Sequence, residues 1–162
     1  FACNPEGITM TTKRNALLVA GLLAGFISAG SVWAHGNVVP QAVATQGLTP
    51  IKDAGVPVDA DGWAAVNPYR TTPEHDKAVE IGSSAYNQNC AACHGLEAKS
   101  GGIAPDLRML DVGEAGDEWF VERVRHGAVR DGRVYMPKMA DYVSQEALWA
   151  VRTYLDSVHV EE

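Results

Sequence analysis

The chain has 162 residues, which suits one domain with a single core, and 46% of its residues are hydrophobic. Acidic residues outnumber basic ones, 20 to 13, and the formal net charge of −7 argues against a nucleic-acid partner. Of its three cysteines, Cys3 is expected to be absent from the mature protein, which leaves only Cys90 and Cys93.

The start of the sequence predicts a secretory signal peptide. Met10 is the expected initiator, and residues 1–9 are interpreted as an upstream extension. Two basic residues then precede an apolar run at 16–29, followed by Ser31-Val32-Trp33-Ala34, which is interpreted as a cleavage site with small residues. This order is typical of a signal peptide, and the run is shorter than the ~20 residues of a spanning helix. We expect residues 10–34 to be removed after Ala34; the alternative is an uncleaved membrane anchor.

Residues 35–73 are predicted to form an irregular N-terminal arm. The segment has little periodicity and many glycines and prolines, which interrupt regular structure. Trp63 and Tyr69 are the expected apolar anchors of the arm on the domain that follows. The alternative is a disordered tail, which fits residues 35–60 best.

A compact domain is expected over residues 74–160, and its first helix should begin at Glu74 or Asp76 and end at Asn89. Small and apolar residues recur there at helical spacing, and the acidic residues suit the first turn. Gly82 destabilises a helix interior relative to alanine. We therefore expect a second helix to pass close to the chain at this position.

The segment Cys90-Ala91-Ala92-Cys93-His94 follows this helix and reads C-x-x-C-H, the pattern that attaches a c-type haem. Two thiols on one helical turn can reach two vinyl groups on one porphyrin edge, and His94 can bind the iron. C-x-x-C also occurs in dithiol redox centres and in zinc sites. Zinc would need a second cysteine pair, and a dithiol enzyme would need a βαβ pattern. Covalent haem is therefore the preferred prediction.

A loop at 101–107 follows the motif and contains the pair Gly101-Gly102. The glycines permit tight turning close to a porphyrin. The backbone carbonyl of Pro105 is expected to accept a hydrogen bond from Nδ1 of His94, which would fix the ring and tune its basicity. The alternative is an ordinary connecting loop.

A second helix is predicted from Asp117 to His126, with acidic residues in its first turn and Gly127 as its stop. The window 123–138, which overlaps its end, holds five basic residues and one acidic residue. One interpretation is a positive surface that steers docking onto an acidic partner. The other is a set of solvated side chains without a common role.

Met136 is the predicted distal ligand of the iron. Pro137 pushes the preceding backbone into an extended conformation, so that the thioether can point inward. Met139 is the runner-up, and Met109 and His126 are further candidates. For the methionines the alternative role is filling the core.

The clearest amphipathic helix is predicted from Gln145 to Ser157, with Ser144 as its N-cap. Apolar residues repeat there at intervals of three and four. No convincing strand pattern and no internal repeat is found. The sequence therefore predicts an all-α fold.

Residues 74–158 resemble a class I c-type cytochrome domain. The resemblance implies three to four helices around one covalent haem c. It also implies that Gly82 packs against an aromatic residue of the last helix, Trp149 or Tyr154. The site residues that it implies are Cys90 and Cys93 as thioether positions, His94 as proximal ligand, the Pro105 carbonyl as partner of His94, and Met136 as distal ligand.

More of the chain is similar to the periplasmic cytochromes c that accept electrons from pyrroloquinoline-quinone-dependent alcohol dehydrogenases. The segments that carry this similarity are HGNV at 35–38, NPYR at 67–70, IGSSAYNQNC at 81–90, GLEAKSGG at 95–102 and VRHGAVRDGRVYMPKM at 124–139.

This similarity implies a soluble, monomeric, periplasmic carrier of single electrons rather than an enzyme. Its donor would be a quinoprotein alcohol dehydrogenase, and its acceptor a downstream cytochrome or a terminal oxidase, each met transiently. The competing function is a haem enzyme or ligand sensor with an open distal position, such as a peroxidase. A dithiol oxidoreductase is the third possibility.

Overall fold

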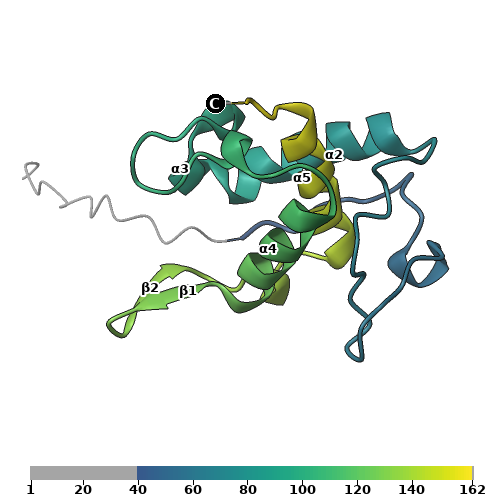
Figure 1. Ribbon diagram of the computed structural model, residues 1–162, viewed down its shortest axis with the longest axis horizontal. Helices are drawn as coiled ribbons and strands as arrows, with labels where there is room; N and C mark the ends of the chain where they lie inside the picture. Colours follow the sequence, from purple (N-terminus) through teal and green to yellow (C-terminus); the bar gives the residue numbers. More distant parts are fainter. Residues whose placement is uncertain (1–39, 162) are drawn as a thin grey trace, which may run out of the picture. The chain divides into compact units, whose positions relative to one another are not determined.

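The computed structural model describes residues 40–161, so the predicted signal peptide and the start of the arm lie outside the described residues. Among them are four α-helices and one small sheet (Figure 1). The elements in chain order are η1 (Ile51–Asp53), α2 (His75–Asn89), α3 (Ala91–His94), η2 (Leu96–Ala98), η3 (Leu107–Met109), α4 (Gly113–His126), β1 (Ala128–Arg130), β2 (Arg133–Met136), η4 (Met139–Asp141) and α5 (Gln145–Ser157).

Helices α2 and α5 pass so close to each other that only glycine fits at their contact. A Cβ atom on Gly82 would lie 1.9 Å from the carbonyl oxygen of Ala150 and 2.9 Å from the backbone nitrogen of Val151. The predicted close approach at Gly82 is therefore confirmed. The nearest atoms belong to the backbone of α5 rather than to the ring of Trp149 or Tyr154.

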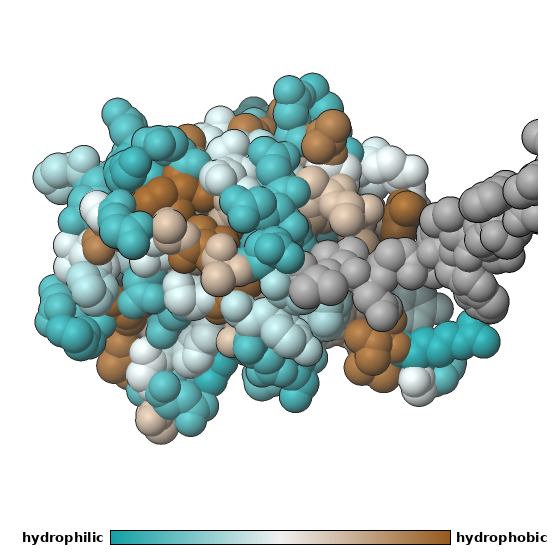
Figure 2. All heavy atoms as spheres, turned by 180° about the vertical axis from the view of Figure 1, so that it is seen from behind, coloured by the Kyte–Doolittle hydropathy of each residue, from teal (hydrophilic) through white to brown (hydrophobic). Residues whose placement is uncertain are grey.

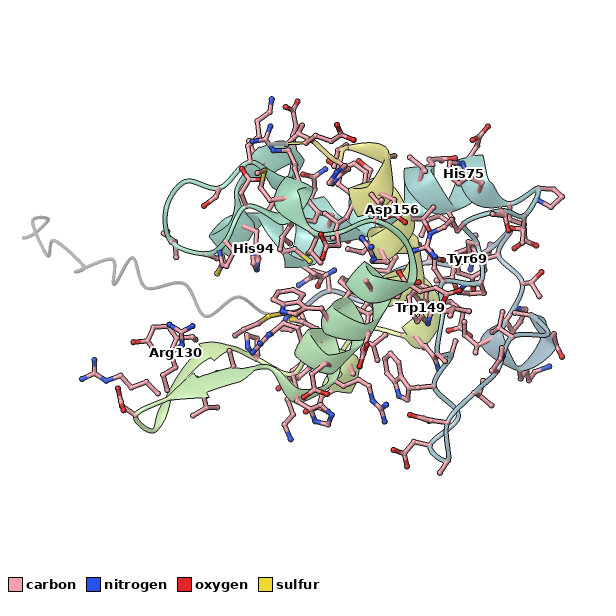
Figure 3. The ribbon with its side chains drawn as sticks, in the orientation of Figure 1. Tyr69, His75, His94, Arg130, Trp149 and Asp156 are labelled. Carbon is pink, nitrogen blue, oxygen red and sulfur yellow. The ribbon has the colours of Figure 1, made fainter. Side chains whose placement is uncertain are left out.

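The described part of the N-terminal arm packs against α2 and α5, and Val43 already contacts the buried clusters of the core. Leu48, Ile51 and Tyr69 are buried in one apolar cluster with Ile81 and Trp149. The hydroxyl of Tyr69 donates a hydrogen bond to the carbonyl of Thr49 at 2.8 Å. Figure 3 places Tyr69 and Trp149 together, away from His94. The arm is thus part of the hydrophobic core of the described chain.

A buried ionic network joins the arm to α4 and α5. The carboxylate of Asp117 is fully buried and accepts hydrogen bonds from both terminal nitrogens of Arg70, at 2.9 and 2.5 Å. Arg152, also fully buried, donates to the same carboxylate through Nε at 2.9 Å. Arg70 and Arg152 both reach Asp156 as well. Three segments distant in sequence are therefore held around one carboxylate.

The predicted start of the helix at Asp117 is wrong, because α4 begins at Gly113. Gly113 has a φ of 77°, a conformation that glycine adopts easily, and Glu114 supplies the acid of the first turn. Asp117 lies inside the helix, where its partners are arginines from other segments. The predicted end at His126 is confirmed, with Gly127 as C-cap.

The strands β1 and β2 form an antiparallel hairpin that the sequence analysis did not predict. The turn between them is Asp131-Gly132, and both residues have positive φ angles, 50° and 73°. Asp-Gly with two positive φ angles is typical of a type I′ hairpin turn. The strands are three and four residues long and mostly exposed, so they show little hydrophobic alternation.

The C-terminal helix agrees with its prediction. It spans Gln145–Ser157, and the hydroxyl of Ser144 accepts a hydrogen bond from the backbone amide of Ala147 at 3.3 Å.

No helix among residues 40–161 is long and apolar enough to cross a membrane. The face in Figure 2 carries mainly hydrophilic side chains, with hydrophobic ones in separate groups.

Candidate functional site

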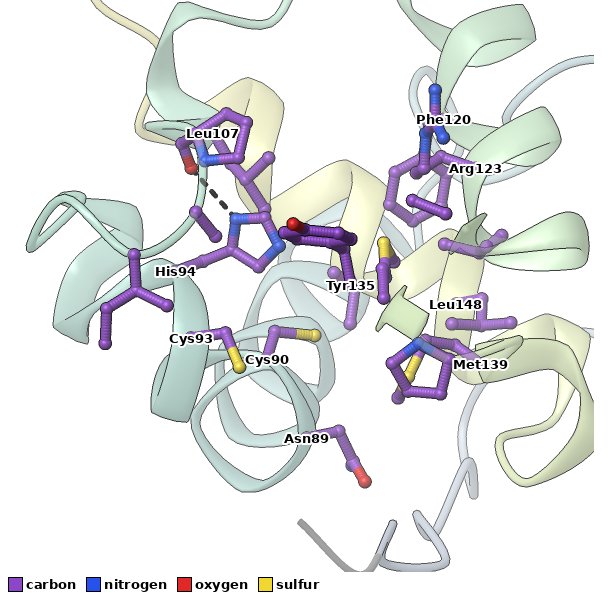
Figure 4. Close-up of a pocket in the computed structure, with 18 of the residues that line it drawn as sticks. Asn89, Cys90, Cys93, His94, Leu107, Phe120, Arg123, Tyr135, Met139 and Leu148 are labelled. Atoms are coloured by element: carbon purple, nitrogen blue, oxygen red, sulfur yellow. Dashed lines mark hydrogen bonds between the residues drawn. The ribbon is translucent and has the colours of Figure 1, made fainter. Parts of the chain in front are cut away.

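A cavity of about 550 Å³ opens between α3, α4 and the hairpin. Its volume lies in the usual range of small-molecule sites, about 300–1,000 Å³. Figure 4 shows that side chains from several elements surround one space. The lining residues that carry the argument are Cys90, Cys93, His94, Pro105, Trp119, Phe120, Arg123, Arg130, Tyr135, Met136, Met139 and Leu148.

The two thiols reach this cavity because α3 is a single helical turn placed directly after α2. The backbone amides of Cys93 and His94 both donate to the carbonyl of Cys90, at 3.1 and 3.0 Å. This turn brings Cys90, Cys93 and His94 to the same wall (Figure 4). Both cysteines are free, so both sulfurs are available for covalent attachment.

The ring of His94 is held by the loop that follows the motif. Its Nδ1 atom lies 2.9 Å from the carbonyl oxygen of Pro105, drawn as a dashed line in Figure 4. A carbonyl only accepts hydrogen bonds, so Nδ1 carries the proton and Nε2 is free to bind a metal.

The loop that supplies the Pro105 carbonyl is itself fixed by Asp106. The Asp106 carboxylate accepts hydrogen bonds from the backbone amides of Ser100, at 3.3 Å, and Arg108, at 3.0 Å. The guanidinium of Arg108 binds the same group and holds its pKa at about 2, below the ordinary value for aspartate. The lowered pKa keeps the carboxylate ionised into the acidic range, so the loop keeps this acceptor there as well as at neutral pH.

Both rival methionines lie at the cavity. Met136 ends β2 and is partly buried, whereas Met139 is only 4% exposed and belongs to the core. The base of the hairpin packs tightly on the end of α4, since a Cβ on Gly127 would lie 2.4 Å from the carbonyl oxygen of Met136. Met109 and His126 are not among the cavity-lining residues, and His126 instead faces Glu122 at 3.5 Å.

The environment of Cys90 does not suit a dithiol oxidoreductase. Burial, and secondarily the neighbouring Cys93, raises the pKa of the Cys90 thiol to about 12. A dithiol enzyme needs a nucleophilic thiolate, which requires a lowered pKa. A zinc site is not supported either, because residues 40–161 contain no cluster of three His, Cys, Asp or Glu side chains that could hold a metal.

The cavity fits a haem by the chemistry of its walls. Two free thiols and an oriented imidazole share one wall, two thioethers lie among the remaining lining residues, and most of the lining is apolar. A porphyrin is flat and apolar and needs these groups for its vinyl edge and its iron.

Comparison with known proteins agrees with this chemistry. The chain is 61% identical over 151 residues to a cytochrome c550 of Pseudomonas aeruginosa. The aligned residues cover 93% of this chain and 99% of that protein. The chain belongs to the c-type cytochromes. It therefore binds covalent haem c and is an electron-transfer protein rather than an enzyme, and the predicted class I cytochrome fold is confirmed.

Further similarities are partial. Residues 77–155 match the family model described as cytochrome c oxidase, cbb3-type, subunit III. A quinohemoprotein alcohol dehydrogenase of Pseudomonas putida is 36% identical over 78 residues, 48% of this cytochrome and 10% of the dehydrogenase. The dehydrogenase subunit of a quinone-dependent alcohol dehydrogenase of Gluconobacter oxydans is 38% identical over 79 residues, with the same shares. No solved structure gives a significant match.

Proposed function

We propose that this cytochrome is a periplasmic carrier that takes single electrons from a quinoprotein alcohol dehydrogenase and passes them to a downstream cytochrome or terminal oxidase. The observation that carries the proposal is the cavity with His94 on one wall and a methionine among its other lining residues. The similarity of this cytochrome to a segment of quinohemoprotein alcohol dehydrogenases supports the choice of donor. The predicted removal of residues 10–34 supports the periplasm.

In the mechanism that we propose, the residues of the cavity hold a covalent haem, which would supply the iron that gains and loses the electron. Cys90 and Cys93 would attach the porphyrin edge, and Nε2 of His94 would bind the iron from a ring whose orientation Pro105 fixes. Met136 would bind the iron as the second protein ligand and keep water and other ligands away from it. A His/Met ligand pair raises the reduction potential, which suits an electron acceptor.

In the proposed complex the hairpin is the docking surface, and its cations differ from Arg125 of the same basic window in their ion pairing. Arg125 forms ion pairs with Asp59 and Asp61, at 2.6 and 2.8 Å, so its charge is already compensated. Within residues 40–161, Arg133 and Lys138 form no ion pair, and both residues are exposed.

Apolar side chains accompany these cations on the hairpin. Val129 and Val134 pair across the two strands and are 62% and 67% exposed. Cations around a small apolar contact are suited to a transient complex with an acidic protein surface. We therefore place the docking of the dehydrogenase on the hairpin, next to the cavity.

Reversing the charge of both Arg133 and Lys138 with glutamate should slow reduction by the dehydrogenase at least tenfold at low ionic strength. The reason is the loss of electrostatic steering, which contributes about 10- to 1,000-fold to association rates. Stopped-flow reduction of the ferric cytochrome, measured over a range of salt concentrations, tests this. Lys52→Glu reverses another exposed charge, on η1, and should have little effect. Equal rates for the double variant and the unmodified protein would contradict the proposed docking site.

A further inference from the structure

The loop at residues 100–106 must hold one backbone carbonyl in place, although packing does little to fix it. None of these seven residues is buried, and none belongs to a helix or strand. The loop contains Gly101 and Gly102, and glycine has more backbone freedom than any other residue. Nδ1 of His94 nevertheless depends on the carbonyl of Pro105 in this loop, 2.9 Å away (Figure 4). Polar contacts must therefore hold that carbonyl in position.

Ser100 binds the residues on both sides of Pro105. Its hydroxyl donates a hydrogen bond to the carbonyl of Ala104 and accepts one from the backbone amide of Gly102 at 2.9 Å. Its backbone amide donates to the carboxylate of Asp106 at 3.3 Å. Because Pro105 lies between Ala104 and Asp106, a single residue restrains the chain before and after it.

Asp106 connects the loop to the rest of the fold. Its carboxylate accepts hydrogen bonds from Nε of Arg108 at 3.0 Å and from a terminal nitrogen of the same guanidinium at 2.8 Å. Two parallel bonds of this kind fix orientation as well as charge. The backbone carbonyl of Arg108 accepts a hydrogen bond from the amide of Val160 at 3.1 Å, and Leu107 is buried in the core. The loop is thereby fixed to the segment that follows α5.

These contacts can affect a metal that His94 binds. A histidine ligand that donates its other N–H group to a fixed acceptor is held in one orientation and is more basic. A more basic ligand stabilises ferric iron relative to ferrous iron. Any residue that keeps the Pro105 carbonyl in place therefore affects the reduction potential through the hydrogen bond of His94.

We propose that Ser100 and Asp106 together hold the Pro105 carbonyl against Nδ1 of His94 and thereby tune the reduction potential. This inference rests on the proposed binding of the iron by His94. Both are positioning residues, because neither is among the residues that line the cavity and each acts through the backbone of the loop.

The test uses four variants of the purified holoprotein. Ser100→Ala removes both hydrogen bonds of the hydroxyl without changing the charge, whereas Ser100→Thr keeps a hydroxyl. Asp106→Asn keeps the size of the side chain and removes its charge. Glu97→Gln is the matched control, because it removes one negative charge on η2, where Glu97 forms an exposed ion pair with Lys99.

Two quantities are measured without a partner protein. The first is the rate at which the Nδ1 proton of His94 exchanges with solvent in the ferrous protein, followed by nuclear magnetic resonance. The second is the midpoint reduction potential. The exchange rate reports the hydrogen bond to Pro105 directly, and the potential reports the effect of that bond on the iron.

Ser100→Ala and Asp106→Asn should each speed up the exchange of the His94 proton about five- to tenfold, because loss of a hydrogen bond lets the loop open more often. Both should raise the potential, since a less basic ligand favours ferrous iron. Ser100→Thr should resemble the unmodified protein in both quantities. Glu97→Gln should leave the exchange rate unchanged, and a rise in its potential would measure the effect of charge alone.

Exchange in Ser100→Ala and Asp106→Asn at the rate found in Glu97→Gln would overturn the inference while leaving the proposed function intact. Faster exchange with an unchanged potential in Ser100→Ala would overturn the effect on the iron. Absence of His94 resonances shifted by a porphyrin ring current from the unmodified ferrous protein would instead overturn the proposed ligation. Far-ultraviolet circular dichroism of each variant establishes that the fold is retained before these comparisons are made.

Discussion

Replacing Met136 with alanine is expected to abolish the Met–iron charge-transfer band of the ferric protein and to lower its reduction potential by about 0.1 V or more. The axial ligand is one of the strongest determinants of haem potential, and loss of the thioether removes the ligand that favours ferrous iron. Absorption spectroscopy and redox titration measure the two effects. The ferrous variant should also acquire the ability to bind carbon monoxide.

Met139→Leu is the control that separates the two methionines. Met139 is 4% exposed in the core, and leucine has a similar volume, so the cost in stability should be below about 1.5 kcal/mol. The charge-transfer band and the potential should be retained. The opposite pattern, with the band lost in Met139→Leu and kept in Met136→Ala, would assign the iron to Met139.

Replacing Asp117 with asparagine should cost about 3–5 kcal/mol in the free energy of unfolding. The substitution removes the negative charge that Arg70 and Arg152 share, and it leaves the fully buried guanidinium of Arg152 with less compensation. Asparagine keeps the size of the side chain, so the loss reports charge rather than volume. Urea denaturation of the ferric holoprotein measures it.

Asp53→Asn is the matched control, because Asp53 forms an ion pair with Lys52 that is exposed on both sides. Exposed pairs contribute little, so the change should be below about 1 kcal/mol. Equal losses for the two variants would mean that the network around Asp117 contributes no more than a surface ion pair.

The helices α2 and α5 were predictable because their signals are local. Apolar residues recur at helical spacing, Ser144 caps one helix, and Gly82 marks the contact between them. The start of α4 was not predictable, because in the sequence Asp117 resembles an acidic residue of a first helical turn. In the structure the carboxylate of Asp117 instead binds Arg70 and Arg152, and only the folded chain brings these two arginines to it.

The hairpin was missed for a different reason. Its strands are short, and most of their residues are exposed on both faces. Hydrophobic and polar residues therefore do not alternate along them in the sequence. The dipeptide Asp131-Gly132 was the available signal, since it favours the positive φ angles of a tight hairpin turn.

The site was partly predictable. The motif and Pro105 lie close together in sequence, and the structure brings His94 and Pro105 within hydrogen-bonding distance. Sequence spacing could not separate Met136 from Met139, because both reach the cavity. The sequence identified Arg123 and Arg130 only as two members of a basic window. Both arginines line the cavity, because the end of α4 and the hairpin lie next to each other in the fold.

The most direct test of the account is exposure of the native ferrous protein to carbon monoxide at neutral pH. A carrier whose iron is closed by His94 and Met136 should show an unchanged spectrum on the time scale of mixing. Rapid, stoichiometric formation of a carbon monoxide complex would contradict the account. It would show an open distal position, as expected of a haem enzyme or ligand sensor.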